Sequence, residues 1–256
     1  MKSRQAQSRL VAGPARLFRV GFALAAAVAT TALGAGDDII RAHAEAVFTQ
    51  ARAAWTAAPD DVTNAWKFAR AAFDHAEYAP DDRRRAAIAE EAIRACRAAV
   101  VRDPRSAPAH YYLGLDLGQL ARTKALGALK LVREMERHWL AAKEIDETFD
   151  SGGPDRGLGL LYLEAPGWPA SIGSHAKART HLEHAVKLAP GFPENRLCLA
   201  EALMKWKKRD EAAAQLKALD ASWSDAKARF TGDDWASSWS DWEKRLAALK
   251  TKLKTK

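Results

Sequence analysis

The residues between Gly152 and Pro190 predict two helices packed side by side, and the rest of the chain can be indexed against this segment. It opens with Gly152, Gly153 and Pro154, a combination that ends one helix and begins another, because proline is favoured in the first turn of a helix. Pro190 ends the second helix, because proline breaks the helical hydrogen-bond ladder. A helical hairpin of this kind offers a surface for binding and brings no chemistry of its own.

Small and proline residues recur on both sides of this segment with the phase of a 34-residue repeat. When Pro190 is aligned with the proline that ends a repeat, Ala185 falls at a position where a small residue is expected. The same alignment on Pro104 places Gly114 at the small position of the following repeat. This pattern is typical of tetratricopeptide repeats, in which each repeat is a pair of helices. The predicted structural repeat positions are Pro104, Gly114, Gly159, Ala178, Ala185 and Pro190.

Composition also favours helices, because Ala and Leu are abundant and no alternating strand pattern appears. We expect an all-α, right-handed, tetratricopeptide-like solenoid of about four helical hairpins, with a leading helix over 38–58. An overlong helix is expected over 127–149, and a linker after Leu219. The last helix has an apolar seam, and it either caps the solenoid, contacts another subunit or lies on a membrane surface. The seam consists of Trp235, Trp239, Trp242, Leu246, Leu249 and Leu253.

The first 35 residues are expected to be a secretory signal peptide. They carry basic residues and no acid, and their apolar run at 20–33 is short for a membrane span. An uncleaved anchor is the alternative. The predicted domains are therefore a signal peptide at 1–35, a repeat domain at 36–232 and an amphipathic capping helix at 233–256. The expected location is periplasmic or secreted.

Most of the formal net charge of +8 belongs to this leader. The leader holds 5 of the 40 Lys and Arg residues and none of the 32 Asp and Glu residues, which leaves 35 minus 32, or +3, for the remaining chain. The charge therefore gives little support to a nucleic-acid partner.

The turn inside the indexed hairpin, at 164–174, is longer than a regular repeat requires by about seven residues. Insertions in repeats often lie on the binding face. Trp168 stands between two prolines there, and a large apolar side chain on a restricted loop is a typical binding anchor. The alternative is that Trp168 packs onto its own repeat. The candidate ligand-binding or partner-binding residues are Tyr162, Pro166, Trp168, Pro169 and Ile172.

The segment from Asp150 to Leu219 resembles the periplasmic T-component family of tripartite ATP-independent periplasmic (TRAP) transporters. The resemblance covers this C-terminal third and extends loosely back to Ala107. It implies a helical repeat protein of the periplasm that docks with a solute-binding protein, with a trimer and a hydrophobic passage near the Ala-Pro loop as further expectations. The residues that match the family pattern are Gly152, Gly153, Pro154, Arg156, Gly159, Tyr162, Ala165, Pro166, Gly173, Lys177, Ala178 and Pro190.

Metal-binding or acid–base chemistry finds little support in the sequence. His181 and His184 share one helix face, but a metal site would need an acidic or histidine partner from another helix, and none is identifiable from the sequence. We therefore expect no metal and no cofactor. Asp146, Glu147 and Asp150 are expected to form a solvated helix face rather than a general acid and base.

Catalytic motifs such as a nucleophile elbow, a phosphate-binding glycine loop or paired metal-binding cysteines are absent from the sequence, so we expect no enzyme. Cys96 and Cys198 are expected to be buried free thiols.

The leading functional hypothesis is an adaptor that contacts a periplasmic solute-binding protein or a small hydrophobic ligand. The alternative is a general tetratricopeptide scaffold for protein partners in the cell envelope, and an enzyme that uses His181 and His184 is third. A homo-oligomer remains open.

Overall fold

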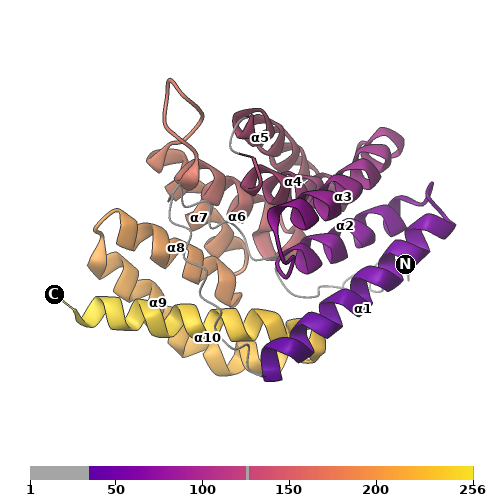
Figure 1. Cartoon of the computed structure of the whole chain (residues 1–256). Coiled ribbons are helices and arrows are strands. Elements are labelled where there is room, and N and C mark those ends of the chain that lie inside the picture. Colours follow the sequence, from indigo (N-terminus) through magenta and orange to yellow (C-terminus); the bar gives the residue numbers. More distant parts are fainter. Residues whose placement is uncertain (1–34, 125–126, 256) are drawn as a thin grey trace, which may run out of the picture. The chain divides into compact units, whose positions relative to one another are not determined.

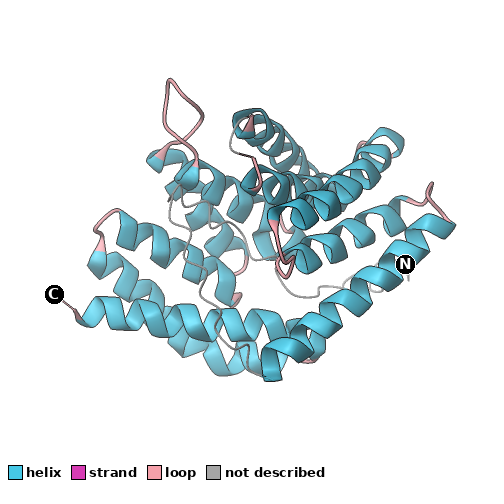
Figure 2. Cartoon of the chain, in the orientation of Figure 1, coloured by secondary structure: helices cyan, strands magenta, loops and turns pink. Residues whose placement is uncertain are grey.

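The computed structural model describes residues 35–124 and 127–255. Within these residues the chain forms ten α-helices and no β-strand, which confirms the predicted all-α fold (Figure 2). Apart from its last residue, the predicted signal peptide lies outside the described residues. None of the described helices combines the length and the apolar character needed to cross a membrane. The helices are α1 (Ala35–Ala57), α2 (Val62–Ala76), α3 (Asp82–Arg102), α4 (Ala107–Arg122), α5 (Ala128–Ile145), α6 (Phe149–Glu164), α7 (His175–Leu188), α8 (Pro193–Lys205), α9 (Arg209–Arg229) and α10 (Asp233–Lys254).

The described residues up to Ala189 belong to one compact unit, and those from Pro190 belong to a second. In the first unit each helix packs on the next along the chain, and the first helices of successive hairpins also meet, since α4 contacts both α2 and α6 (Figure 1). The hairpins α2–α3, α4–α5 and α6–α7 are therefore stacked, as in tetratricopeptide repeats. The expected leading helix is present as α1, which packs on α2.

Glycines allow the central helices of this unit to approach closely. The indole of Trp139 on α5 is fully buried and donates a hydrogen bond from Nε1 to the carbonyl of Tyr111 on α4 at 3.1 Å. A Cβ atom on Gly114 of α4 would overlap this ring, and one on Gly157 of α6 would lie 2.9 Å from it. A Cβ on Gly159 would lie 2.7 Å from Cγ of Leu182 on α7. The small residues are therefore what lets these side chains fit between the helices.

The helix predicted over 127–149 is present as α5, but it ends earlier than expected, at Ile145. The last residue of the predicted range, Phe149, begins α6. Asp146 forms the turn between them, because its Oδ1 accepts hydrogen bonds from the backbone N–H of Thr148 at 3.0 Å and from the Thr148 hydroxyl at 2.7 Å. Such local side-chain bonds compete with helix continuation, and the apolar periodicity alone did not reveal them.

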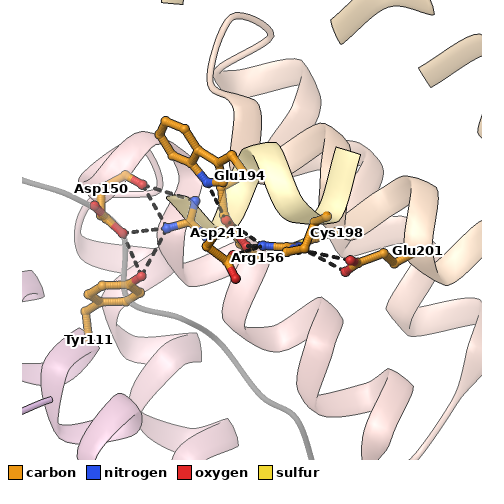
Figure 3. Close-up of polar contacts among 9 residues, drawn as sticks. Tyr111, Asp150, Arg156, Glu194, Cys198, Glu201 and Asp241 are labelled. Atoms are coloured by element: carbon orange, nitrogen blue, oxygen red, sulfur yellow. Dashed lines mark hydrogen bonds and ion pairs between the residues drawn. The ribbon is translucent and has the colours of Figure 1, made fainter. Parts of the chain in front are cut away.

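A left-handed stretch within α6 explains the Gly-Gly-Pro and Arg element. Asp150, Ser151 and Gly152 have positive φ angles of 49°, 56° and 80°, so the chain turns sharply before Pro154. Arg156 is fully buried and donates to the Asp150 carbonyl at 3.2 Å and also to its carboxylate. The side chains that hold this turn point toward one another (Figure 3), and they include Tyr111, whose hydroxyl donates to Asp150 Oδ2 at 2.7 Å. The buried ion pair therefore fixes a costly backbone conformation.

The second unit consists of α8, α9 and α10, and α10 packs on both other helices. The apolar seam of α10 is buried at Trp235, Trp242, Leu246 and Leu249, as the spacing predicts. The predicted linker after Leu219 is wrong, because α9 continues to Arg229.

A buried ion network attaches α10 to α8 (Figure 3). Glu194 of α8 is buried, and the guanidinium of Arg245 donates to both of its carboxylate oxygens, at 2.8 and 2.9 Å. The same guanidinium binds Glu201 at 2.9 Å, and Nε1 of Trp242 donates to Glu194 at 2.7 Å. All these partners are charged or hydrogen-bonded, so the pairing compensates for the cost of burying Glu194.

Replacing Gly114 by Ala is expected to destabilise the fold by about 1–3 kcal/mol, because the added methyl overlaps the buried indole of Trp139. Urea denaturation followed by circular dichroism measures the loss. Gly191→Ala is the matched control, since nothing lies within 4 Å of the atom it adds. Equal unfolding free energies for the two variants would contradict the packing described above.

Replacing Arg245 by Met is expected to cost about 3–5 kcal/mol, because it leaves the buried Glu194 carboxylate without its partner. The unfolding free energy of Arg245→Met is compared with that of Lys252→Met, which removes an exposed cation from the same helix. Adding Glu194→Gln to Arg245→Met should restore part of the loss. A variant as stable as the control would show that the network contributes nothing to the attachment of α10.

Candidate functional site

The insertion at 165–174, here the Trp168 loop, projects from the α6–α7 hairpin (Figure 1). Trp168 in this loop is 89% exposed, and Pro166 and Pro169 are also exposed. The loop is closed by backbone hydrogen bonds, in which Gly173 N–H donates to the carbonyl of Pro166 at 2.9 Å and Ala170 N–H to that of Gly167 at 3.1 Å. Trp168 therefore does not pack on its own repeat, and its indole is presented on a loop with its own internal bonds.

The other two candidate partner-binding residues lie at the base of this loop. Ile172 is half-buried, and Tyr162 is buried in α6. The Tyr162 hydroxyl donates to Glu136 at 2.6 Å, and its carbonyl accepts the N–H of Ser174 at 2.9 Å. The ammonium of Lys177 also lies over its ring, 4.8 Å from the centre. Tyr162 thus anchors the loop, whereas Pro166, Trp168 and Pro169 form its exposed part.

A cluster of polar side chains also meets at this hairpin. It is centred on the carboxylate of Asp155, which lies on α6 and is completely buried. Its Oδ1 accepts hydrogen bonds from Lys143 Nζ at 2.7 Å and His181 Nδ1 at 2.6 Å. Its Oδ2 is 2.8 Å from Nδ1 of His184. Glu147 is exposed and lies 3.9 Å from Nε2 of His184. These five residues, Lys143, Glu147, Asp155, His181 and His184, are called the Asp155 cluster below.

The hydrogen bonds of this cluster keep Asp155 ionised. Burial alone would raise the pKa of Asp155, but the hydrogen bonds from His181, Lys143 and His184 lower that pKa to about 2. An ionised carboxylate only accepts hydrogen bonds, so each histidine presents an Nδ1–H group to Asp155.

The Asp155 cluster contains the acidic partner that could not be identified from the sequence. Glu147, Asp155 and His184 each offer one ligand atom, and these atoms lie within 4.8 Å of one another. Asp155 is 26 residues before His181 and 29 before His184, so only the packing of α6 on α7 brings them together. The available signal was the spacing of the two histidines, which places both on one face of α7.

The predicted solvated face of Asp146, Glu147 and Asp150 is wrong for Asp150. This side chain is buried, whereas Asp146 and Glu147 are exposed. Burial raises the pKa of Asp150, and Arg156 opposes that shift. The left-handed turn at Asp150 directs it inward, and helical periodicity does not apply to such a turn.

Cys96 and Cys198 are free and buried, as expected. Burial raises the pKa of both thiols well above the ordinary value, so neither carries the thiolate character that a nucleophile needs.

Comparison with known proteins supports the repeat fold. The tetratricopeptide protein TTC0263 of Thermus thermophilus matches with a TM-score of 0.60 at 19% identity, over 85% of this chain and 100% of that chain. PilF of Pseudomonas aeruginosa matches with a TM-score of 0.51 at 17% identity, over 86% of this chain and 90% of that chain. These identities show the shared fold alone. The chain is therefore a tetratricopeptide-like helical repeat protein.

Residues 36–149 match the family described as regulator of microtubule dynamics protein 1-3. This match covers less than half of the 256 residues and excludes the Trp168 loop and most of the α6–α7 hairpin. No match was found among curated proteins.

The low pKa of Asp155 makes the free energy of unfolding depend on pH in the acidic range. The pKa of about 2 lies below the ordinary aspartate value of 3.8, so the stabilising contribution is complete above about pH 4 and is lost as pH falls through about 2. We expect the wild-type unfolding free energy to fall over this window by roughly 2 kcal/mol more than that of Asp155→Asn. Urea denaturation at several pH values measures the difference, and Asp225→Asn, at an exposed position of α9, should keep the wild-type slope. Parallel curves for wild type and Asp155→Asn would refute this role.

Proposed function

We propose that this chain is a non-catalytic scaffold that binds a protein partner, and that the Trp168 loop is a principal contact. The observation that carries the proposal is the 89% exposure of Trp168. Water does not favour an indole, and Trp is enriched among the residues that dominate binding energies at interfaces. Stacked helical hairpins also commonly provide extended binding surfaces.

The internal hydrogen bonds of the loop favour a binding role. A contact residue held on a restricted loop loses little conformational freedom when its partner binds, so more of the interaction energy appears as affinity. The bonds from Gly173 to Pro166 and from Ser174 to Tyr162 hold both ends of the loop. The exposed part then consists of Pro166, Trp168 and Pro169, which are apolar and carry no charge.

A narrower form of the proposal follows from the resemblance to TRAP T-components. In this form the chain is exported to the periplasm, and the Trp168 loop contacts a solute-binding protein or a small hydrophobic ligand. The support is that the matched Ala165 and Pro166 lie in the projecting loop itself. The general scaffold has the wider support, because it needs only the repeat fold and the exposed indole.

The proposal is tested by placing a photo-crosslinking amino acid at position 168 and, in a second protein, at Val101. Val101 is a matched control because it is an apolar residue of α3 that is 81% exposed. The tagged full-length chain is expressed in its native host, irradiated and purified. We expect a defined crosslinked protein from position 168 and none, or a different one, from position 101.

The partner identified in this way is then titrated against wild type, Trp168→Ala and Val101→Ala. Loss of the indole should weaken binding about tenfold or more, and Val101→Ala should leave it unchanged. A solute-binding protein as partner would support the narrower form, and an envelope-assembly protein would support the general scaffold. Equal affinity for all three proteins would overturn the assignment of the loop.

A further inference from the structure

Three side chains of the Asp155 cluster have the chemistry and the spacing of metal ligands. Glu147 precedes α6, Asp155 lies on α6 and His184 lies on α7, and their ligand atoms are all within 4.8 Å of one another. Asp155 Oδ2 and His184 Nδ1 are 2.8 Å apart, and Glu147 Oε2 is 3.9 Å from Nε2, the other ring nitrogen of His184. Two ligands that each lie about 2.1 Å from one ion are separated by roughly 3–4 Å, so only small shifts are needed.

The two oxygens of Asp155 have different surroundings. Oδ1 accepts hydrogen bonds from Lys143 and His181, whereas Oδ2 faces His184. An ion at Oδ2 therefore leaves the contacts at Oδ1 in place, and these contacts fix the orientation of the carboxylate. The hydrogen bond from His181 is of the kind that is common around metal sites, where it orients the ligating group and raises the affinity.

The burial of the cluster allows an ion to enter. Asp155 is completely buried, His184 is half-buried and Glu147 is exposed. One side of the proposed site is therefore open to solvent, and an ion can reach the buried carboxylate from there. Two carboxylates balance the charge of a divalent ion. The imidazole favours zinc, nickel or copper over calcium and magnesium, which take oxygen ligands.

We propose that Glu147, Asp155 and His184 bind one divalent transition-metal ion of the zinc class, with water completing the coordination. The ion takes the position between His184 Nδ1 and Asp155 Oδ2, and the neutral imidazole then carries its proton on Nε2. Protonation of the imidazole competes with the ion, so affinity falls as the pH is lowered. Lys143 keeps the affinity moderate, because its ammonium lies 2.7 Å from the same carboxylate.

The test is calorimetric titration of zinc chloride into the chelator-treated full-length chain at pH 7.5. We expect one zinc ion per chain, with affinity lowered about tenfold or more by His184→Gln and by Glu147→Gln. Lys143→Met should raise the affinity several-fold, because it removes a competing positive charge. His175→Gln is the matched control, since His175 is an exposed histidine in the first turn of the same helix.

Circular dichroism establishes that each variant is folded, and Glu147→Gln alters only an exposed side chain. No zinc binding by the wild type would overturn the proposal. So would affinities for His184→Gln and Glu147→Gln equal to that of the wild type, or equal losses in His175→Gln and His184→Gln. Calcium binding in place of zinc would also overturn it. Trp168→Ala should bind zinc normally, which separates this site from the proposed protein contact.

Discussion

The first unit depends on the close approach of α4, α5 and α6 around the indole of Trp139. The ring is fully buried, and glycines at 114 and 157 leave the space it occupies. Its Nε1 also needs an acceptor inside the protein, and the carbonyl of Tyr111 provides one. Shape and hydrogen bonding therefore require the same arrangement, so a single side chain sets the positions of three helices relative to one another.

The placement of α6 in turn determines where its polar residues lie. Gly153 packs so closely on the ring of Tyr111 that a Cβ would come within 2.9 Å of it, and Tyr111 also binds Asp150. Arg156 completes this contact from inside the unit and holds the left-handed turn at Asp150 and Ser151. With the start of α6 fixed in this way, Asp155 faces α7 instead of solvent. The energetic cost of the turn and of the buried charges is thus linked to the position of the Asp155 cluster.

Sequence reasoning succeeded where the signal was periodic. The repeat phase around Pro104 predicted stacked hairpins, and the spacing of the Trp and Leu seam predicted the buried side of α10. It failed where a side chain changes the local backbone, as at the Asp146 turn. It also missed Asp155 as a partner of the histidines, because residues 26 and 29 positions apart meet only through tertiary packing. Repeat patterns report which faces are buried, but they do not report which polar groups converge between them.

The chemistry of the Asp155 cluster favours binding over proton transfer. A general base near neutral pH works best when its pKa is close to the operating pH, whereas hydrogen bonds lower the pKa of Asp155 to about 2. Each of its oxygens already faces a donor, and the histidines are oriented by the carboxylate they bind. Such an arrangement holds its members in fixed positions, which suits a ligand site or a rigid support. Because the same hairpin carries the Trp168 loop, a firmly joined α6 and α7 also provides a stable base from which an exposed indole can contact a partner.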